Sequence, residues 1–237
     1  MNPTRIASPP AGFWAFSAQV IPRLLPGALL TLELTAAALV LGVVLATLAA
    51  LMRISKNPLL RGISGVYVTV IRGTPALLQV LFVYDALPSM AGQWGGDAWR
   101  QVFTLSAFTA GTLALGVNAG AYIAEIIRAA IQSIDRGQME AARSLGMGHN
   151  QAMWRIIIPQ TFRRLTPPMV NEAVALLKDT SLVGIVALTE LLRTGKLIFS
   201  TTFRYEPYIW AAAMYLVMTI ALSVWANRLE ARLEARE

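Results

Sequence analysis

Residues 27–52 read GALLTLELTAAALVLGVVLATLAALM, an apolar run that is interrupted only by Glu33. A helix that crosses the hydrocarbon core of a bilayer needs about 20 apolar residues, so this run is long enough to span a membrane. The whole chain has the same character, because 56% of its 237 residues are hydrophobic and only 14% are charged. This composition predicts an integral membrane protein and excludes a disordered chain, a coiled coil and an ordinary soluble enzyme.

Four further segments have the length and apolarity of a span, which predicts an all-α, polytopic membrane fold with about five transmembrane helices in one domain. We expect the spans at residues 27–52, 62–87, 104–127, 169–192 and 207–227. Residues 11–26 contain Pro22 and Pro26, and we expect them to lie along the membrane surface or to form a disordered tail. In the third span, Gly116 and Gly120 have the G-x-x-x-G spacing of closely packed helices, either within the chain or against a second chain.

The basic residues are divided unevenly between the loops, and this division predicts the orientation. The loops after the first and third spans and the tail after the fifth carry twice as many lysines and arginines as the loops on the opposite side. Because cytoplasmic loops carry the excess of basic residues, we expect the N-terminus outside and the C-terminus in the cytoplasm. The net charge of +7 is then mainly an orientation signal. The arginines do not form a basic face with interleaved aromatic residues, so the sequence does not predict binding to nucleic acid.

Catalytic groups are scarce in this chain. Cysteine is absent and His149 is the only histidine, which leaves no disulfide, thiolate nucleophile or typical zinc site. The nearest approach to a phosphate-binding loop, at Thr194–Leu197, lacks the required hydroxyl residue and the earlier glycine. We therefore expect no enzyme activity, no cofactor and no metal in this chain. Two alternatives are a self-contained secondary transporter, for which five spans are too few to form the usual inverted repeat, and a membrane-embedded enzyme.

The longest predicted cytoplasmic loop, residues 131–167, has the pattern of two short helices joined by a turn. Residues 139–145 are good helix formers, and Gly146 is suited to end that helix. Asn150 can cap a second helix, which Pro159 ends or kinks. The residues alone leave two interpretations: a helix pair that lies on the lipid headgroups, or a docking knob for a soluble partner.

A resemblance to a known family favours docking. Glu140-Ala141-Ala142, followed after three residues by Gly146 and after nine more by Ile156-Ile157-Ile158-Pro159, resembles the EAA signature of permease subunits of bacterial ATP-binding-cassette importers. Ile158 stands where many members have leucine. Other segments are similar to the polar amino acid branch of that family, and together they cover about residues 25–230. These segments are Ile71–Pro75 with Gln79, Tyr122–Arg128, Gly137-Gln138 and Leu177–Leu182.

The resemblance implies a type I importer in the bacterial inner membrane, in which two permease chains form a homodimer or heterodimer. Two ATPase subunits would hold the ATP and Mg, and an extracytoplasmic solute-binding protein would deliver the amino acid substrate. A coupling helix at about residues 136–145 would enter a cleft of the ATPase and drive alternating access. The residues implied in coupling are Glu140, Ala141, Ala142, Gly146 and Pro159.

Several ionisable and polar residues fall within the predicted spans. A charge there costs on the order of 3 kcal/mol on insertion scales, so it usually faces a cavity or a partner. Lys178 and Asp179 point about 100° apart on a helix, so each needs its own partner, or the span is broken near Thr180-Ser181. We expect a substrate pathway, with structural ion pairs as the alternative, and its two acids favour a cationic amino acid. The pathway residues are Asp179, Lys178, Thr180, Ser181, Arg72 and Asp85.

Overall fold

The computed structural model describes residues 10–234, which form helices joined by short connections. The termini, on which the predicted orientation also depends, lie partly outside the described residues. The elements are α1 (Phe13–Ile54), α2 (Pro58–Arg72), α3 (Ala76–Leu81), η1 (Phe82–Ala86), α4 (Leu87–Phe103), α5 (Ala107–Gln132), α6 (Arg136–Ser144), α7 (His149–Ala152), η2 (Met153–Ile157), α8 (Ile158–Asp179), η3 (Thr180–Val186), α9 (Leu191–Thr202) and α10 (Glu206–Glu234). Segments η1 and η2 are π-helical and η3 is a 3₁₀-helix. The predicted all-α fold is confirmed.

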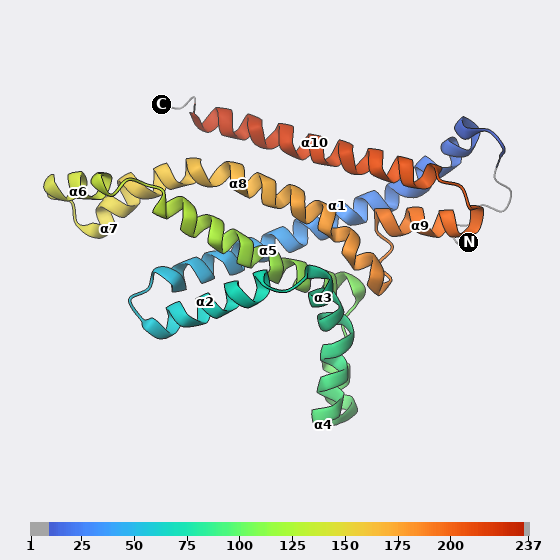
Figure 1. The fold of residues 1–237 in the computed structure, drawn as a ribbon, viewed down its shortest axis with the longest axis horizontal. Helices are drawn as coiled ribbons and strands as arrows, with labels where there is room; N and C mark the ends of the chain where they lie inside the picture. The colour runs from blue at the N-terminus through green and yellow to red at the C-terminus, as the bar shows by residue number, and fades with distance from the viewer. Residues whose placement is uncertain (1–9, 235–237) are drawn as a thin grey trace.

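The long helices lie lengthwise beside one another, and the connections are sorted to the two ends of the bundle (Figure 1). Helices α6 and α7, the turn between α1 and α2, and the C-terminal part of α10 lie at one end. Helix α9 and the start of α10 lie at the other end. The segments with the excess of basic residues therefore share one end of the molecule.

Helix α1 begins well before the predicted first span. It runs without interruption from Phe13 and includes both Pro22 and Pro26, so the expectation of a separate surface segment or tail at residues 11–26 is wrong. Phe16 and Leu24 are fully buried in a cluster with side chains of α9 and α10. This burial offsets the cost of the two prolines, because apolar packing contributes more than local helix propensity.

Helices α1 and α5 pack closely along a seam of small residues. A Cβ atom on Gly42 would lie 3.2 Å from the carbonyl oxygen of Gly116 and from the side chain of Ala119. A Cβ on Gly116 would lie 2.7 Å from the side chain of Leu41. The predicted G-x-x-x-G contact is therefore made within this chain, between α1 and α5.

The predicted second span, residues 62–87, is broken rather than straight. Helix α2 ends at Arg72, and the chain bends by 104° before the helix that begins at Ala76. Pro75 lacks an N–H group and cannot continue α2, so the bend falls at Gly73–Pro75. Within α4 the chain then reverses direction at Gly96, whose φ of 75° is easily adopted only by glycine. Segments α3 to α4 consequently form an arm that projects from the bundle (Figure 1).

The predicted fourth span, residues 169–192, also has different bounds. Helix α8 begins at Ile158 and ends at Asp179, where the chain changes to the 3₁₀-helix η3. A break near Thr180 was one of the two expectations for this span, and the structure has it. Glu190 starts α9 by accepting hydrogen bonds from the backbone N–H groups of Leu192 and Arg193, both at 2.7 Å. The sequence did not predict α9 as a separate helix.

Three described helices, α1, α5 and α10, are each long and apolar enough to cross a membrane, and the bent pair of α2 with α3–α4 counts as a fourth. Helix α8 is not among them, because it carries many polar residues. It nevertheless lies alongside α5 and α10 in the bundle (Figure 1). A polar helix that packs among apolar ones is typical of the wall of a transport pathway.

Candidate functional site

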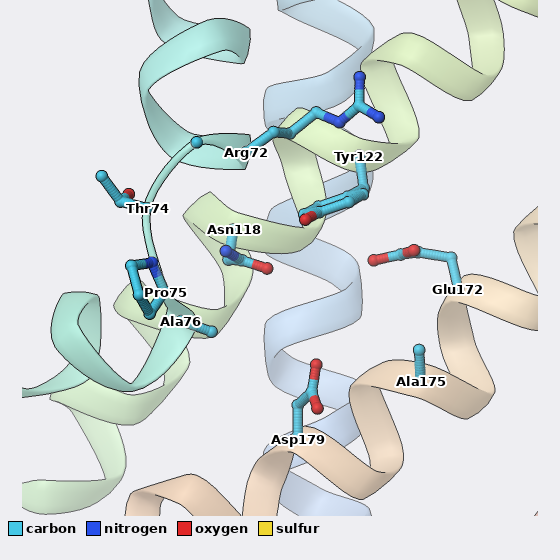
Figure 2. Close-up of a pocket in the computed structure, with 10 residues that line it drawn as sticks. Arg72, Thr74, Pro75, Ala76, Asn118, Tyr122, Glu172, Ala175 and Asp179 are labelled. Carbon is cyan, nitrogen blue, oxygen red and sulfur yellow. The ribbon is translucent and has the colours of Figure 1, made fainter.

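A cavity of about 520 Å³ lies between α5, α8 and the bend that joins α2 to α3 (Figure 2). Its polar side chains come from all three of these elements. The lining residues are Arg72, Gly73, Thr74, Pro75, Ala76, Asn118, Tyr122, Glu172, Ala175 and Asp179.

One wall of the cavity carries two carboxylates. Glu172 and Asp179 stand seven residues apart on α8, which places them on the same face, and Figure 2 shows both side chains directed into the cavity. The small Ala175 between them leaves the space open. Two carboxylic acids on one wall give this side of the cavity the groups that would complement a bound cation.

The opposite wall carries a guanidinium. Arg72 is the last residue of α2, and its guanidinium carbon lies 5.0 Å from the centre of the Tyr122 ring on α5. A cation over an aromatic ring is attracted by the ring quadrupole, and this contact orients Arg72 at the cavity. Within the described residues the guanidinium forms no ion pair, so it can bind an anion.

An amide network fixes the bend beside the cavity. The Gln79 side chain donates to the carbonyl oxygens of Ile71 at 2.9 Å and Thr74 at 3.2 Å, which satisfies acceptors freed where α2 ends. The Asn118 amide donates to the Gln79 side chain at 3.0 Å and so ties α5 to the bend. The oxygen of Asn118 is left facing the cavity as a hydrogen-bond acceptor (Figure 2).

The structure brings together only two of the six residues expected in the substrate pathway, Arg72 and Asp179. Lys178 and Ser181 line a separate cavity beside α10, because neighbours on a helix point in different directions. Thr180 is fully buried, and its hydroxyl group donates to the carbonyl oxygen of Leu177 at 2.7 Å. Asp85 is exposed on η1 and does not line the cavity.

Sequence reasoning missed Glu172, Asn118 and Tyr122. The spacing of seven between Glu172 and Asp179 was a usable signal, since it puts two acids on one helix face. The spacing of four between Asn118 and Tyr122 likewise puts these two polar side chains on one face of α5.

The residues expected in coupling lie at the end of the bundle that carries α6. Asp135 caps this helix by accepting the backbone N–H of Gly137 at 2.6 Å. Glu140 and Ala141 are exposed, whereas Ala142 is buried and faces the interior. Gly146 follows the helix with a φ of 83°, which fits its expected role in ending the helix.

The second short helix of this loop differs from the expectation. Helix α7 begins at His149 with Gly148 at its N-cap, so Asn150 does not cap it. Pro159 follows directly after the π-helical segment η2, where the regular α-helical hydrogen bonding of the preceding helix is interrupted, and it lies in the first turn of α8.

Residues 38–235 match the family described as "Binding-protein-dependent transport system inner membrane component". The chain belongs to this family. The resemblance drawn from the sequence is thereby confirmed: this permease is a multi-pass inner membrane protein, and the ATPase of its transporter is a separate subunit.

Individual relatives cover nearly the whole permease. It is 33% identical over 225 residues to the arginine transport system permease protein ArtQ of Bacillus subtilis, covering 94% of this chain and 98% of that one. It is 35% identical over 222 residues to the glutamine transport system permease protein GlnP of Escherichia coli, covering 93% and 97%. A chain of a crystal structure described as an amino acid ABC transporter with histidines matches with a TM-score of 0.83 and 40% identity, covering 94% and 99%.

Proposed function

We propose that this permease translocates a polar amino acid, with a preference for cationic ones, and that the cavity between α5 and α8 is its substrate site. The observation that carries the proposal is the placement of Arg72 opposite Glu172 and Asp179 around one cavity (Figure 2). An amino acid at neutral pH carries an α-carboxylate and an α-ammonium group, and the two walls offer the complementary charges.

The balance of charge in the cavity supports the preference for a cationic substrate. One guanidinium faces two carboxylates, so the α-carboxylate and α-ammonium groups leave one acid for a positive side chain. The relatives named above transport arginine or glutamine, and the matched crystal structure contains histidines. A polar amino acid is therefore consistent with both the cavity and the family.

The remaining machinery is proposed from the family and from the layout of the chain. The exposed Glu140, Ala141 and Gly146 around α6 would contact the ATPase subunit, which would hold the ATP and Mg. Helix α6 and the segments with the excess of basic residues lie at the same end of the bundle. Because basic residues concentrate on the cytoplasmic side, this arrangement supports a cytoplasmic C-terminus and an external N-terminus. An extracytoplasmic solute-binding protein and a second permease chain would complete the transporter in the lipid bilayer.

The test uses the permease reconstituted in proteoliposomes with its ATPase and binding protein. Uptake and ATP hydrolysis are measured for a panel of amino acids, including arginine, lysine, histidine and glutamine. We expect uptake that depends on ATP and is fastest for a cationic amino acid. Preference for a neutral amino acid would remove the argument from charge, and no uptake of any amino acid would overturn the proposed function.

A further inference from the structure

A row of polar side chains continues along α5 beyond the cavity. It consists of Asn118, Tyr122, Glu125, Arg128 and Gln132, which are separated by three or four residues and therefore share one face of the helix. The first two line the cavity between α5 and α8. The row thus leads from that cavity toward the end of the bundle that carries α6 (Figure 1).

Glu125 holds Arg128 in a fixed position on this row. The Arg128 Nε atom donates to both carboxylate oxygens of Glu125, at 3.0 and 2.9 Å, and its Nη1 atom donates to the side chain of Gln132. The side chains of Arg128 and Glu125 are 31% and 27% exposed, so the pair is open on one side. The Arg128 Nη2 atom also donates to Glu125, so the pair fixes the orientation of Arg128, and only the Nη1 and Nη2 N–H groups that these bonds do not use can receive another anion.

A second, smaller cavity of about 190 Å³ opens beside Arg128, at the ends of α1 and α5. Its lining contains two guanidinium groups and no carboxylate: it consists of Arg53, Ile54, Arg128, Ile131 and Gln132. The Arg53 side chain makes a long hydrogen bond of 3.5 Å to the carbonyl oxygen of Arg61. This cavity is therefore suited to a small anion.

Positive charge is in excess around this second cavity. Glu125 lies within electrostatic reach of three guanidinium groups, those of Arg128, Arg72 and Arg53. Glu125 pairs with Arg128, and Arg72 also has Glu172 and Asp179 beside it, so Arg53 is the guanidinium of the three with no carboxylate against it among the described residues. An anion in this cavity would balance the charge of Arg53.

We propose that Arg128 and Arg53 form a second substrate site, which binds the α-carboxylate of the amino acid after it leaves Arg72. This inference rests on the proposed function and adds a second binding step to it. The α-carboxylate is common to all amino acids, so this site accepts them all. Selectivity remains with Glu172 and Asp179 in the first cavity.

The test compares uptake of arginine and glutamine by reconstituted complexes that carry Arg128→Gln, Arg128→Lys or Arg61→Gln. Arg61→Gln is the matched control, because it removes one exposed arginine at the same end of the bundle that does not line the cavity. We expect Arg128→Gln to lower the maximal uptake rate about tenfold for both amino acids, as for the loss of a charged hydrogen bond. We expect Arg128→Lys to retain most of the rate, and the substrate concentration for half-maximal uptake to change little.

A fourth variant, Glu125→Gln, separates this role from a structural ion pair. It leaves the charge of Arg128 in place, so we expect it to lose less activity than Arg128→Gln. Equal losses in the two variants, or wild-type uptake by Arg128→Gln, would overturn the second site and leave the proposed function intact. A loss seen in anionic phosphatidylglycerol vesicles but not in zwitterionic phosphatidylcholine vesicles would assign Arg128 to an anionic lipid headgroup, and this result would also overturn the second site. If the wild-type complex takes up no amino acid, the proposed function and the second site both fail.

Discussion

Glu172 and Asp179 stand two helical turns apart on one face of α8, and both carboxylates point into the same cavity (Figure 2). A helix that must present two acids inside a membrane protein cannot also be uniformly apolar. Together with Arg163, Arg164 and Lys178 on the same helix, these acids keep α8 from qualifying as a span by hydropathy, although it packs against α5 and α10. The site that α8 lines thus accounts for part of the polarity of this helix.

The first prediction concerns selectivity. Replacing Asp179 with Asn keeps the shape of the side chain and removes its charge, so we expect arginine uptake to fall about tenfold relative to glutamine uptake. Competitive uptake of the two labelled amino acids by proteoliposomes measures this ratio. Asp85→Asn is the matched control, because Asp85 is exposed and does not line the cavity. An unchanged ratio in Asp179→Asn would show that this carboxylate does not contact the substrate side chain.

The second prediction concerns Arg72. Since its guanidinium would bind the α-carboxylate that every amino acid carries, Arg72→Gln should raise the half-saturating concentration of arginine and of glutamine by a similar factor of about ten. Arg72→Lys keeps the charge but loses the planar contact with Tyr122, so it should have a smaller effect. A loss confined to one of the two amino acids would contradict this role.

The third prediction concerns coupling. Gly146→Asp introduces a side chain where φ is 83° and a charge at the expected ATPase contact. We expect normal membrane insertion and a loss of more than about tenfold in substrate-stimulated ATP hydrolysis by the complex, because a strained, charged turn should no longer fit the ATPase cleft. Gly148→Asp adds the same charge at an ordinary φ of −66° and should lose less. Normal ATP turnover in Gly146→Asp would remove Gly146 from the coupling contact.

The fourth prediction concerns the seam between α1 and α5. Gly42→Leu would force a side chain against Gly116 and Ala119, and overpacking of this kind costs about 1–3 kcal/mol. We expect a lower Tm in detergent-purified protein. Gly62→Ala is the control, since a Cβ at Gly62 meets nothing within 4 Å and alanine favours the helix. A Tm for Gly42→Leu equal to that of the wild type would mean that the seam can separate at little cost.

Much of this fold is predictable from the sequence, because membrane spans leave a strong hydropathy signal. The limits of that signal appear at particular residues. Pro22 and Pro26 suggested a break, yet they lie within α1 because Phe16 and Leu24 pack against helices distant in sequence. The bend at Pro75 interrupts an apolar run, which hydropathy alone cannot detect.

The candidate site was predictable only in part. Arg72 and Asp179 were found because charges within a span are rare and informative. Glu172 lies in the expected span and on the same helix face as Asp179, so its spacing of seven from Asp179 could have identified it. The contribution of Asn118 depends on the approach of α5 to the bend, and only the packing of the folded chain reveals it.

The most direct test of the account is equilibrium binding of radiolabelled arginine to the purified permease–ATPase complex, without the binding protein, for the wild type and for the Glu172→Gln/Asp179→Asn double variant. If the cavity is the substrate site, the wild-type complex binds arginine and the double variant binds it at least about tenfold more weakly, because both complementary charges are lost. Equal arginine affinity in the two complexes would contradict the assignment of the cavity as the substrate site.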